Sequence, residues 1–559
     1  METSAIKSSP FINSKIIESA PHFLVALFAF AVYFSSSAPG LTWAHESQDS
    51  GELAAACAVL GITHPTGYPL YTIIGGLLIH LFGIFDPARI MVLISVISGA
   101  ISIGIISKTA SIALGIGRGN LKISPATENW LCAIAALFAA INPIIWSQSI
   151  ICEVYSFAFL LNSLSWFFLV KYIEAVRTGD ERRANAQILI LGFILGLTLA
   201  HHIAGIAFLL PVIIVFIALR NRNPLKSACW LLLPMIPGIA LYAYLPIASR
   251  LNPPLDWGNP ENWVNFSRHV TAWQYRGLIF GTPEPEFIRR LNEFPVGDFW
   301  GIVGGFLAVT GIISMFYYGK KNVPLMGIAI SILAYSVWII IFAIGYFVTD
   351  YEIYFYPLAI PIVLTIAFGI AFLFGHLGKF HKLLPWLLVL TVIANLGYNF
   401  YDHRTDMDLS DPRLNDAISF VTRAMRVISP DSIVIVNTDG HTASLLYAIN
   451  VGVESPWSDE KFGPRPDLDL VTANLVKYDW FRENVQDRKR LVFNYNGHDR
   501  DEGLMLLIEQ NFPARPIFID KQVREIIESV TDKYKFEPYG PLFRLEYKNH
   551  TVNVSITEK

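Results

Sequence analysis

The run ARIMVLISVISGAISIGIISKTASIAL at residues 88–114 contains only two charged side chains, Arg89 and Lys108. As a helix rising about 1.5 Å per residue, it is long enough to cross a hydrocarbon core about 30 Å thick. Ten further apolar runs are expected to span a membrane: 22–38, 129–146, 153–171, 186–200, 203–219, 228–247, 299–318, 324–347, 356–376 and 384–399. The sequence therefore predicts an α-helical polytopic membrane protein with about eleven transmembrane helices.

The composition agrees with this class. Of 559 residues, 53% are hydrophobic and 16% are charged, whereas soluble domains carry about 25% charged residues. This excludes a large soluble enzyme, a fibrous protein and a disordered chain. The 42 basic and 45 acidic residues give a net charge of −3, so no charge excess favours nucleic acid as a partner. Four cysteines without a CxxC pair are expected to be small packing residues: Cys57, Cys132, Cys152 and Cys229.

The short loops predict the orientation of the chain. Basic residues gather in alternate loops: Arg118 and Lys122, 171–183, 220–226, 320–321 and 379–382. The loops between them, such as SQSIICE and TDYEIYF, contain no Lys or Arg. The positive-inside rule places the basic loops and the N-terminal segment 1–21 in the cytoplasm. All of the basic loops fall on the cytoplasmic side only if the run 68–84 does not cross the membrane. We therefore expect that run to lie along or partly within the outer leaflet.

The chain divides into two expected domains after this N-terminal segment. Residues 22–399 form the transmembrane domain, with a first outer loop at 39–87 and an outer cap loop at 248–298. Residues 400–559 are charged and mixed, and we expect a soluble α/β domain on the outer face. Its strands are predicted in SIVIV (432–436), PIFID (516–520) and LFRLEY (542–547), with a helix at 442–449. We find no long repeat, Walker A motif or zinc motif.

Polar residues concentrate in WAHESQDSGELAAACAVLGITHPTGYPLY (43–71), which follows the first span. Carboxylates beside a membrane are costly unless they are solvated, paired or bound to metal. Asp49 and Glu52 also fit a capping box that opens a helix at 50–60. That structural role does not exclude a function, because a cap fixes the direction of a carboxylate.

Further candidates lie at other outer span ends. Glu153 could be functional or could complement a helix dipole. His201 and His202 are neutral imidazoles that could bind metal or phosphate, or ordinary core histidines. Arg250 could bind a lipid phosphate or anchor the chain at the interface.

Aromatic residues accompany these polar groups. Asp256 and Trp257 open the cap loop, where an indole can stack on a sugar or lie at headgroup level. Tyr351 belongs to an aromatic cluster for which an interface belt is the favoured interpretation. Asp439 and His441 in NTDGHT favour turn capping. Because independent loops place such groups on one face, the sequence predicts a site at the outer interface.

Four of these stretches together are specific to a family: DSGELAAACAVLGITHPTGYPLY, WSQSIICEVYSF, GLTLAHH and YLPIASRLNPPLDWGNP. They resemble a bacterial and eukaryotic family whose animal member is a transmembrane protein O-mannosyltransferase, over roughly residues 22–280. That family is similar to the GT-C glycosyltransferases, which use polyprenyl-phosphate sugars on the lumenal or periplasmic side. They keep a catalytic acid in the first outer loop, followed by helices on the membrane surface. Thr66 departs from the family, where many relatives have a second proline.

The resemblance implies an inverting transfer of a sugar, with mannose suggested, to an acceptor hydroxyl. It places Asp49 as the general base, Glu153 as the second acid and Glu52 as the alternative base. Arg250 and the two adjacent histidines are candidates to neutralise the departing lipid phosphate. The expected substrate-binding residues are His64, Tyr68, Tyr155, Asp256, Trp257 and Tyr351.

The implied partners are a polyprenyl-phosphate sugar, a protein, lipid or glycan acceptor, and the bilayer. No ligand spacing demands a metal, although a divalent cation is compatible with the site. The compact loops favour a bacterial inner membrane, with the site and the C-terminal domain in the periplasm. A transporter or lipid-linked sugar flippase is the main alternative. It is disfavoured because the ionisable residues lie at span ends rather than at mid-bilayer. A non-catalytic receptor or assembly protein is a third.

Overall fold

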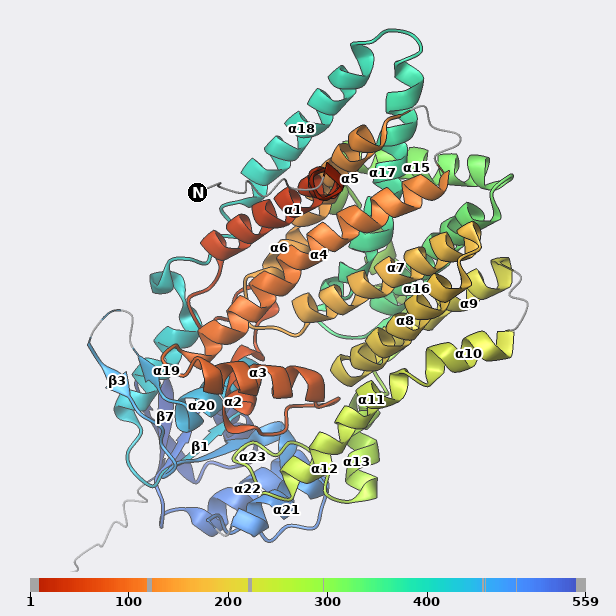
Figure 1. Cartoon of the computed structure of the whole chain (residues 1–559). Helices are drawn as coiled ribbons and strands as arrows, with labels where there is room; N and C mark the ends of the chain where they lie inside the picture. Colours follow the sequence, from red (N-terminus) through yellow and green to blue (C-terminus); the bar gives the residue numbers. More distant parts are fainter. Residues whose placement is uncertain are drawn as a thin grey trace, which may run out of the picture.

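The computed structural model describes residues 10–117, 123–219, 224–294, 296–454, 457, 459–488 and 490–548. A bundle of long helices occupies most of the molecule, and a mixed α/β domain covers one end of it (Figure 1). We call this the domain end of the bundle. Arg118, Lys122, Arg220 and Arg222, which contributed to the predicted orientation, lie outside the described residues.

Nine helical segments within the described ranges are long and apolar enough to cross a membrane. Seven are single helices: α1 (Pro10–Ser36), α4 (Pro87–Gly117), α7 (Tyr155–Thr178), α8 (Glu181–His201), α15 (Val296–Gly319), α16 (Val323–Gly345) and α18 (Leu384–His403). Another joins η6 (Tyr351–Leu358) to α17 (Ala359–Leu377). The ninth, over 225–249, combines α10 (Pro224–Leu232), α11 (Met235–Ile239), η4 (Ala240–Ala243) and α12 (Tyr244–Ser249). The predicted polytopic helical class is confirmed.

The two remaining predicted spans differ from simple helices. Residues 129–146 fall in α5 (Pro125–Ala140) and α6 (Pro143–Ser149), which meet at an angle of 72°. The bend occurs where Asn142 caps α6 and a proline occupies its first turn. Residues 203–219 form η3 (Ile203–Phe208) and α9 (Leu209–Ala218), which are shorter than a full span. The number of long spans is therefore nine, or ten with the bent pair, in the described chain.

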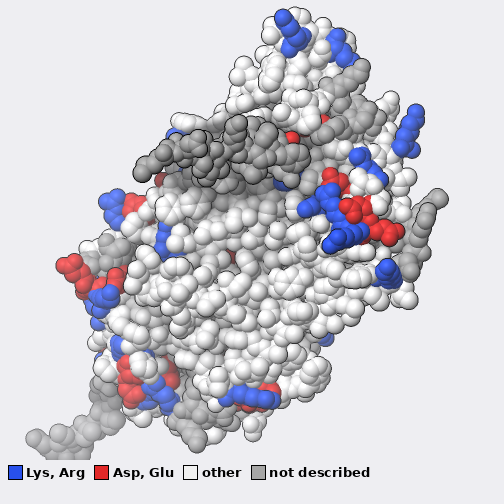
Figure 2. All heavy atoms as spheres, in the orientation of Figure 1, with Lys and Arg blue, Asp and Glu red and all other residues white. Residues whose placement is uncertain are grey.

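The visible face of the bundle carries the surface that a bilayer requires. Figure 2 shows a broad band of uncharged side chains across the helices, with Lys, Arg, Asp and Glu at its margins. Hydrocarbon solvates no charge, so such a band between charged margins is typical of a membrane-embedded surface.

The loop at 39–87 contains the short 3-10 helix η1 (Ala44–Glu46) and two short α-helices, α2 (Ser50–Val59) and α3 (Pro69–Leu81). Both α-helices lie at the domain end (Figure 1). At about 1.5 Å per residue, α3 is too short to cross a hydrocarbon core. The loop-charge argument for a non-spanning segment at 68–84 therefore agrees with the helix that forms there.

The capping-box prediction is wrong, although α2 begins where it was expected. Asp49 precedes the helix, but its side chain makes no capping hydrogen bond. Glu52 instead accepts a hydrogen bond from the backbone N–H of His64 at 2.6 Å. The carboxylate turns away from its own helix because His64 offers it a closer set of donors.

The cap loop holds the neighbouring outer loop in place. It contains α13 (Trp263–Val270), η5 (Trp273–Tyr275) and α14 (Glu284–Asn292). The buried Arg290 of α14 donates to the carbonyls of Tyr346 (2.8 Å) and Val348 (2.9 Å), and its guanidinium lies 3.9 Å from the ring centroid of Tyr351. The loop that carries Asp350 is thus tied to the cap loop.

The C-terminal domain is built on a five-stranded sheet in the order β4-β1-β5-β7-β6. Its strands are β1 (Ile433–Val436), β4 (Asp469–Thr472), β5 (Ile517–Ile519), β6 (Tyr534–Tyr539) and β7 (Leu542–Tyr547). Strand β1 is parallel to β4 and β5, whereas β7 is antiparallel to β5 and β6. The helices are α19 (Asp416–Val427), α20 (Asp439–Asn450), α21 (Asp479–Arg488), α22 (Arg500–Asn511) and α23 (Lys521–Val530). Minor elements are η7 (Pro412–Leu414), η8 (Ala473–Leu475), β2 (Val453–Glu454) and β3 (Lys461–Phe462). The predicted α/β class and its three strands are confirmed.

Helix α20 docks this domain directly onto the first outer loop. The indole N–H of Trp43 lies 3.2 Å from the carbonyl of Gly440 and 3.0 Å from Ser444 Oγ. Tyr447 donates its hydroxyl to Asp86 at 2.7 Å. A Cβ at Gly51 would stand 2.3 Å from the carbonyl oxygen of Ala443. The backbones of α2 and α20 are therefore in direct contact at Gly51, with no room for a side chain between them.

This contact predicts the effect of one added methyl group. In Gly51→Ala the methyl would force α2 and α20 apart, and we expect a loss of about 1–3 kcal/mol in stability. Gly115→Ala in α4 is the matched control, because a Cβ there meets nothing within 4 Å. The control should unfold at the same temperature as the wild type or higher. Equal melting temperatures for both variants, measured by intrinsic fluorescence in detergent, would contradict the packing described.

Candidate active site

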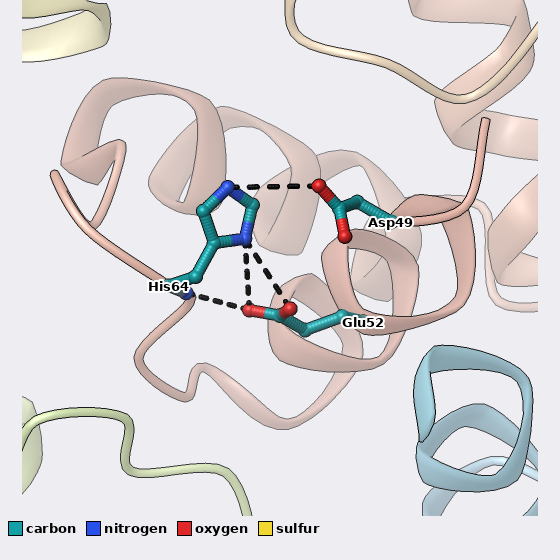
Figure 3. A group of neighbouring side chains, drawn as sticks. All are labelled: Asp49, Glu52 and His64. Atoms are coloured by element: carbon teal, nitrogen blue, oxygen red, sulfur yellow. Dashed lines mark hydrogen bonds and ion pairs between the residues drawn. The ribbon is translucent and has the colours of Figure 1, made fainter. Parts of the chain in front are cut away.

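Three side chains of the first outer loop converge at the domain end (Figure 3). His64 Nδ1 lies 3.2 Å from Glu52 Oε2, and His64 Nε2 lies 3.8 Å from Asp49 Oδ2. Because Glu52 also receives the backbone N–H of His64, it holds both the backbone and the ring of that residue. The imidazole therefore stands between two carboxylates, in what we call the Asp49–Glu52–His64 cluster.

The local chain path explains why residue 64 returns to the start of α2. The helix ends at Leu60 in a left-handed conformation (φ 51°), which reverses the chain. Ile62 then forms a parallel bridge with Asp256, through hydrogen bonds from Ile62 N to Leu255 O (2.8 Å) and from Trp257 N to Ile62 O (3.3 Å). This bridge fixes the segment that presents His64.

The same bridge fixes the position of Asp256. This residue is buried, its carboxylate accepts from Ser249 Oγ at 3.0 Å, and its backbone carbonyl accepts from Asn484 at 2.6 Å. These contacts join the cap loop to α21. Asp256 also lines a cavity beside Glu52, and its predicted substrate contact stays a prediction.

The cluster brings one imidazole and two carboxylates together in a small volume. Burial disfavours the charged form of His64, but Glu52 and Asp49 outweigh it and raise its pKa from 6.5 to about 10. Burial raises the pKa of Asp49, the His64 charge opposes the rise, and Glu52 adds to it. The imidazole is thus cationic at neutral pH, and it compensates the carboxylates beside it.

Two other carboxyl groups face the same region. Glu153 is buried, and burial followed by the charge of Asp49 raises its pKa well above the usual range. Burial also raises the pKa of Asp350, with further contributions from Asp49 and Glu46. The loop TDYEIYF was noticed in the sequence because it contains no Lys or Arg, but nothing in it distinguished Asp350 as a neighbour of Asp49.

The histidine pair and Tyr68 have different environments. His201 is fully buried, and its Nε2 lies 2.8 Å from the carbonyl of Val154. The predicted phosphate contact of His201 is therefore not supported, because the ring packs among aromatic side chains and ties α8 to the start of α7. His202 stacks on Tyr68 with ring centroids 5.9 Å apart. Tyr68 places its hydroxyl 3.1 Å from His64 Nε2, which connects His202 to the cluster.

The remaining predicted residues are only partly brought together. The Trp257 ring lies 6.2 Å from that of His64. The hydroxyl of Tyr155 donates to Tyr354 at 3.3 Å, and its ring lies 6.4 Å from that of His202. Tyr351 packs under Arg290 and does not reach the cluster. Arg250 follows α12 and is exposed, and none of its contacts within the described chain links it to Asp49.

The cluster could hold a divalent cation. One ligand atom from each of Asp49, Glu52 and His64 lies within 4.8 Å of the others. Two carboxylates and one imidazole suit Mn²⁺ or Zn²⁺. A cation would replace the ring proton of His64, so protonation and metal binding are alternative ways to neutralise the same carboxylates.

An apolar cavity of about 410 Å³ adjoins the cluster. Glu52 and Ile62 form part of its wall, and the cap loop and the C-terminal domain supply the rest through residues such as Trp257, Leu446 and Phe481. The C-terminal domain therefore contributes to the surroundings of the cluster. The sequence-based expectation that this domain binds or presents the acceptor stays a prediction.

The raised pKa of His64 predicts a pH dependence of stability. A group whose folded pKa exceeds its unfolded value stabilises fully below about pH 6.5, and this contribution is lost as the pH rises towards 10. Between pH 7 and 9 the wild type should lose stability more steeply than His64→Gln, by about 1.4 kcal/mol per pH unit. His498→Gln, at an exposed histidine, is the control and should follow the wild type. Parallel curves for wild type and His64→Gln in thermal unfolding would show that His64 is not held cationic.

Residues 49–226, which include the cluster, match the family described as "Protein O-mannosyl-transferase TMEM260 N-terminal domain". The mouse Protein O-mannosyl-transferase TMEM260 is 28% identical over 260 residues, which cover 45% of this chain and 34% of the mouse protein. The Dictyostelium discoideum protein of the same name is 23% identical over 535 residues, covering 84% of this chain and 60% of its own length. The chain thus spans between one third and three fifths of these relatives.

Two solved structures share the fold across nearly the whole chain. ArnT from Cupriavidus metallidurans, crystallised with undecaprenyl phosphate, has a TM-score of 0.57 and 13% identity, with 93% of this chain and 97% of ArnT covered. The Archaeoglobus fulgidus oligosaccharyltransferase has a TM-score of 0.51 and 13% identity, with 96% and 75% covered. The resemblance stated from the sequence is confirmed. The chain therefore has the fold of the GT-C-type membrane glycosyltransferases, and its residues 49–226 are similar to the N-terminal domain of the TMEM260-type protein O-mannosyl-transferases.

Proposed function

We propose that this protein transfers a sugar from a polyprenyl-phosphate donor to an acceptor hydroxyl, with inversion at the anomeric carbon. The observation that carries the proposal is the Asp49–Glu52–His64 cluster, with a partly exposed carboxylate beside a cationic imidazole at the domain end. Both curated relatives are named protein O-mannosyl-transferases, which supports mannose as the sugar and a protein hydroxyl as the acceptor. The undecaprenyl phosphate bound to ArnT supports a lipid-linked donor.

Asp49 is the better general base of the two carboxylates in the cluster. The Asp49 side chain is 41% exposed, whereas that of Glu52 is 5% exposed. The oxygens of Glu52 are also engaged by the backbone and the ring of His64. An acceptor hydroxyl can therefore approach Asp49, lose its proton to Oδ2 or Oδ1, and attack the anomeric carbon as the lipid phosphate leaves.

The surrounding groups suit an anionic leaving group. Cationic His64 places positive charge close to the reacting centre, where it stabilises the departing phosphate. Burial raises the pKa of Glu153 and favours its neutral form, which lowers the repulsion of the donor. In this proposal Glu52 orients His64, and Glu153 contributes a hydrogen-bonding acid rather than a second negative charge.

The remaining contacts of the donor and acceptor are assigned to residues around the cluster. Burial lowers the pKa of His202 to about 4, so it would meet the phosphate as a neutral donor. Arg250 supplies a guanidinium on the same side of the bundle, and its phosphate contact remains a prediction. The proposed substrate surface comprises His64, Tyr68, Tyr155 and Trp257.

Replacing the base tests the mechanism. Asp49→Asn keeps the size of the side chain but cannot accept the proton, and we expect transfer of mannose from polyprenyl phosphate mannose to fall at least about 100-fold. Asp532→Asn, at an exposed aspartate of the C-terminal domain, is the matched control and should retain full activity. Unchanged transfer by Asp49→Asn, with the same melting temperature as the wild type, would reject Asp49 as the base.

We further propose that the domain end faces away from the cytosol. The chain then crosses as the loop charges indicated, with 22–399 as the membrane domain and 400–559 outside. Lys320 and Lys321 lie in the turn between α15 and α16, at the end of these helices opposite the cap loop. The bacterial inner membrane remains a prediction, since the curated relatives named above are eukaryotic.

Cysteine labelling tests this orientation. In a Cys229→Ser background the remaining cysteines are buried. An impermeant maleimide added outside intact cells or sealed right-side-out vesicles should label Asp532→Cys and leave Lys320→Cys unlabelled until the membrane is permeabilised. The reverse pattern would place the cluster in the cytosol and remove the basis for a lipid-linked donor on the outer side.

A further inference from the structure

A second cavity, of about 370 Å³, separates the cap loop from the C-terminal domain. The cap loop contributes Arg268, His269 and Trp273, and the segment at the start of α21 contributes Lys477, Tyr478 and Trp480. We call it the cap-loop cavity. It shares Trp480 with the cavity beside Glu52, and its other lining residues are different.

His269 shows that this cavity is built around a polar group. Its side chain is 2% exposed, and no hydrogen bond of standard geometry reaches either ring nitrogen within the described chain, although the backbone of Thr63 lies close enough to raise the pKa of the ring. Two glycines with positive φ make room for the ring. A Cβ at Gly258 would stand 2.4 Å from Nδ1, and a Cβ at Gly67 would stand 2.9 Å from Nε2. Buried imidazoles normally meet a partner, so a ligand in the cavity would supply one.

The walls carry an excess of positive charge. Arg268 lies over the ring of Trp273 (5.1 Å to the centroid), and Lys477 lies over that of Tyr478 (5.3 Å). Neither forms an ion pair among the residues that the structure describes. The acidic residue of the lining, Asp479, is already paired with Arg482. An anionic ligand would therefore find two uncompensated cations.

The cavity adjoins the segment that carries the cluster. Pro65, which follows His64 in the chain, forms one of its walls. The ring of Trp480, at the cavity, lies 5.8 Å from that of Trp257, whose ring lies 6.2 Å from that of His64. One row of packed side chains therefore connects the cap-loop cavity to the cluster.

We propose that the cap-loop cavity binds the acceptor as an anionic polypeptide segment, in which acidic side chains flank the hydroxyl that receives the sugar. This inference rests on the proposed function and names the class of its acceptor. Arg268 and Lys477 pair with the acidic side chains, and Trp273 and Trp480 pack on the chain. A neutral imidazole has one donor and one acceptor, which match the carbonyl and N–H of a peptide group.

The place of the cavity favours a polypeptide over an anionic lipid. One wall belongs to the cap loop and the other to the C-terminal domain, so the cavity lies beyond the end of the bundle rather than between its helices. A lipid headgroup would have to leave the interface to reach Lys477 and His498. A chain from solution enters without such a displacement.

Peptide binding tests the assignment without catalysis. The probe is a fluorescein-labelled peptide with Ser and Thr between Asp and Glu residues, and its counterpart carries Lys in place of the acids. Full-length protein in detergent should bind the acidic peptide at least about tenfold more tightly, and Arg268→Glu/Lys477→Glu should reverse the preference. Lys548→Glu, at an exposed lysine on the same domain, is the matched control and should behave as the wild type.

The outcomes separate this inference from the proposed function. Equal binding of both peptides, or equal losses in the control and the double variant, would overturn the cavity assignment. Displacement of the acidic peptide by phosphatidylglycerol vesicles, with the same sensitivity to the double variant, would assign the cavity to a lipid and also overturn it. Asp49→Asn should still bind the acidic peptide. If the wild type binds the acidic peptide selectively but transfers no sugar, the assignment of the cavity to an anionic polypeptide would stand and the proposed transferase function would be rejected.

Discussion

The structure around the site depends on the need to satisfy a buried carboxylate. Glu52 is almost inaccessible to water, and an unpaired charge there would cost several kcal/mol. His64 meets that need with its backbone N–H and its ring. Once His64 is held, its other ring nitrogen faces Asp49 and Tyr68. One buried interaction thus sets the direction of the groups to which we assign the chemistry.

The same environment raises the pKa values of two neighbouring acids. Burial is the largest cause at both Asp49 and Glu153, and the charge of Asp49 raises the pKa of Glu153 further, whereas His64 opposes the rise at both. The low dielectric of a buried site strengthens all of these effects. Burial therefore favours the neutral form of these acids, which lowers the repulsion that a donor phosphate would meet in the proposed reaction.

Much of the fold was predictable because it is encoded locally. Apolar runs identified the long helices, alternate loop charges distinguished α3 from a span, and short apolar runs identified β1, β5 and β7. The errors concern contacts between distant segments. Asp49 and Glu52 have the spacing of a capping box, but residue 64 decides where Glu52 points. His201 and Asp256 each meet a partner that is distant in the sequence: the carbonyl of Val154 for His201, and Asn484 for Asp256. The docking of α20 and the approach of Asp350 are likewise non-local.

The contact between α2 and α20 has a consequence for how this architecture can change. Gly51 stands against the backbone at Ala443, and Trp43 reaches across to Gly440 and Ser444. The helix that carries Glu52 is therefore packed directly on the C-terminal domain, and neither can be replaced alone. A chimaera that exchanges the C-terminal domain for that of a distant relative must also carry the relative's matching loop, because the two surfaces fit only as a pair.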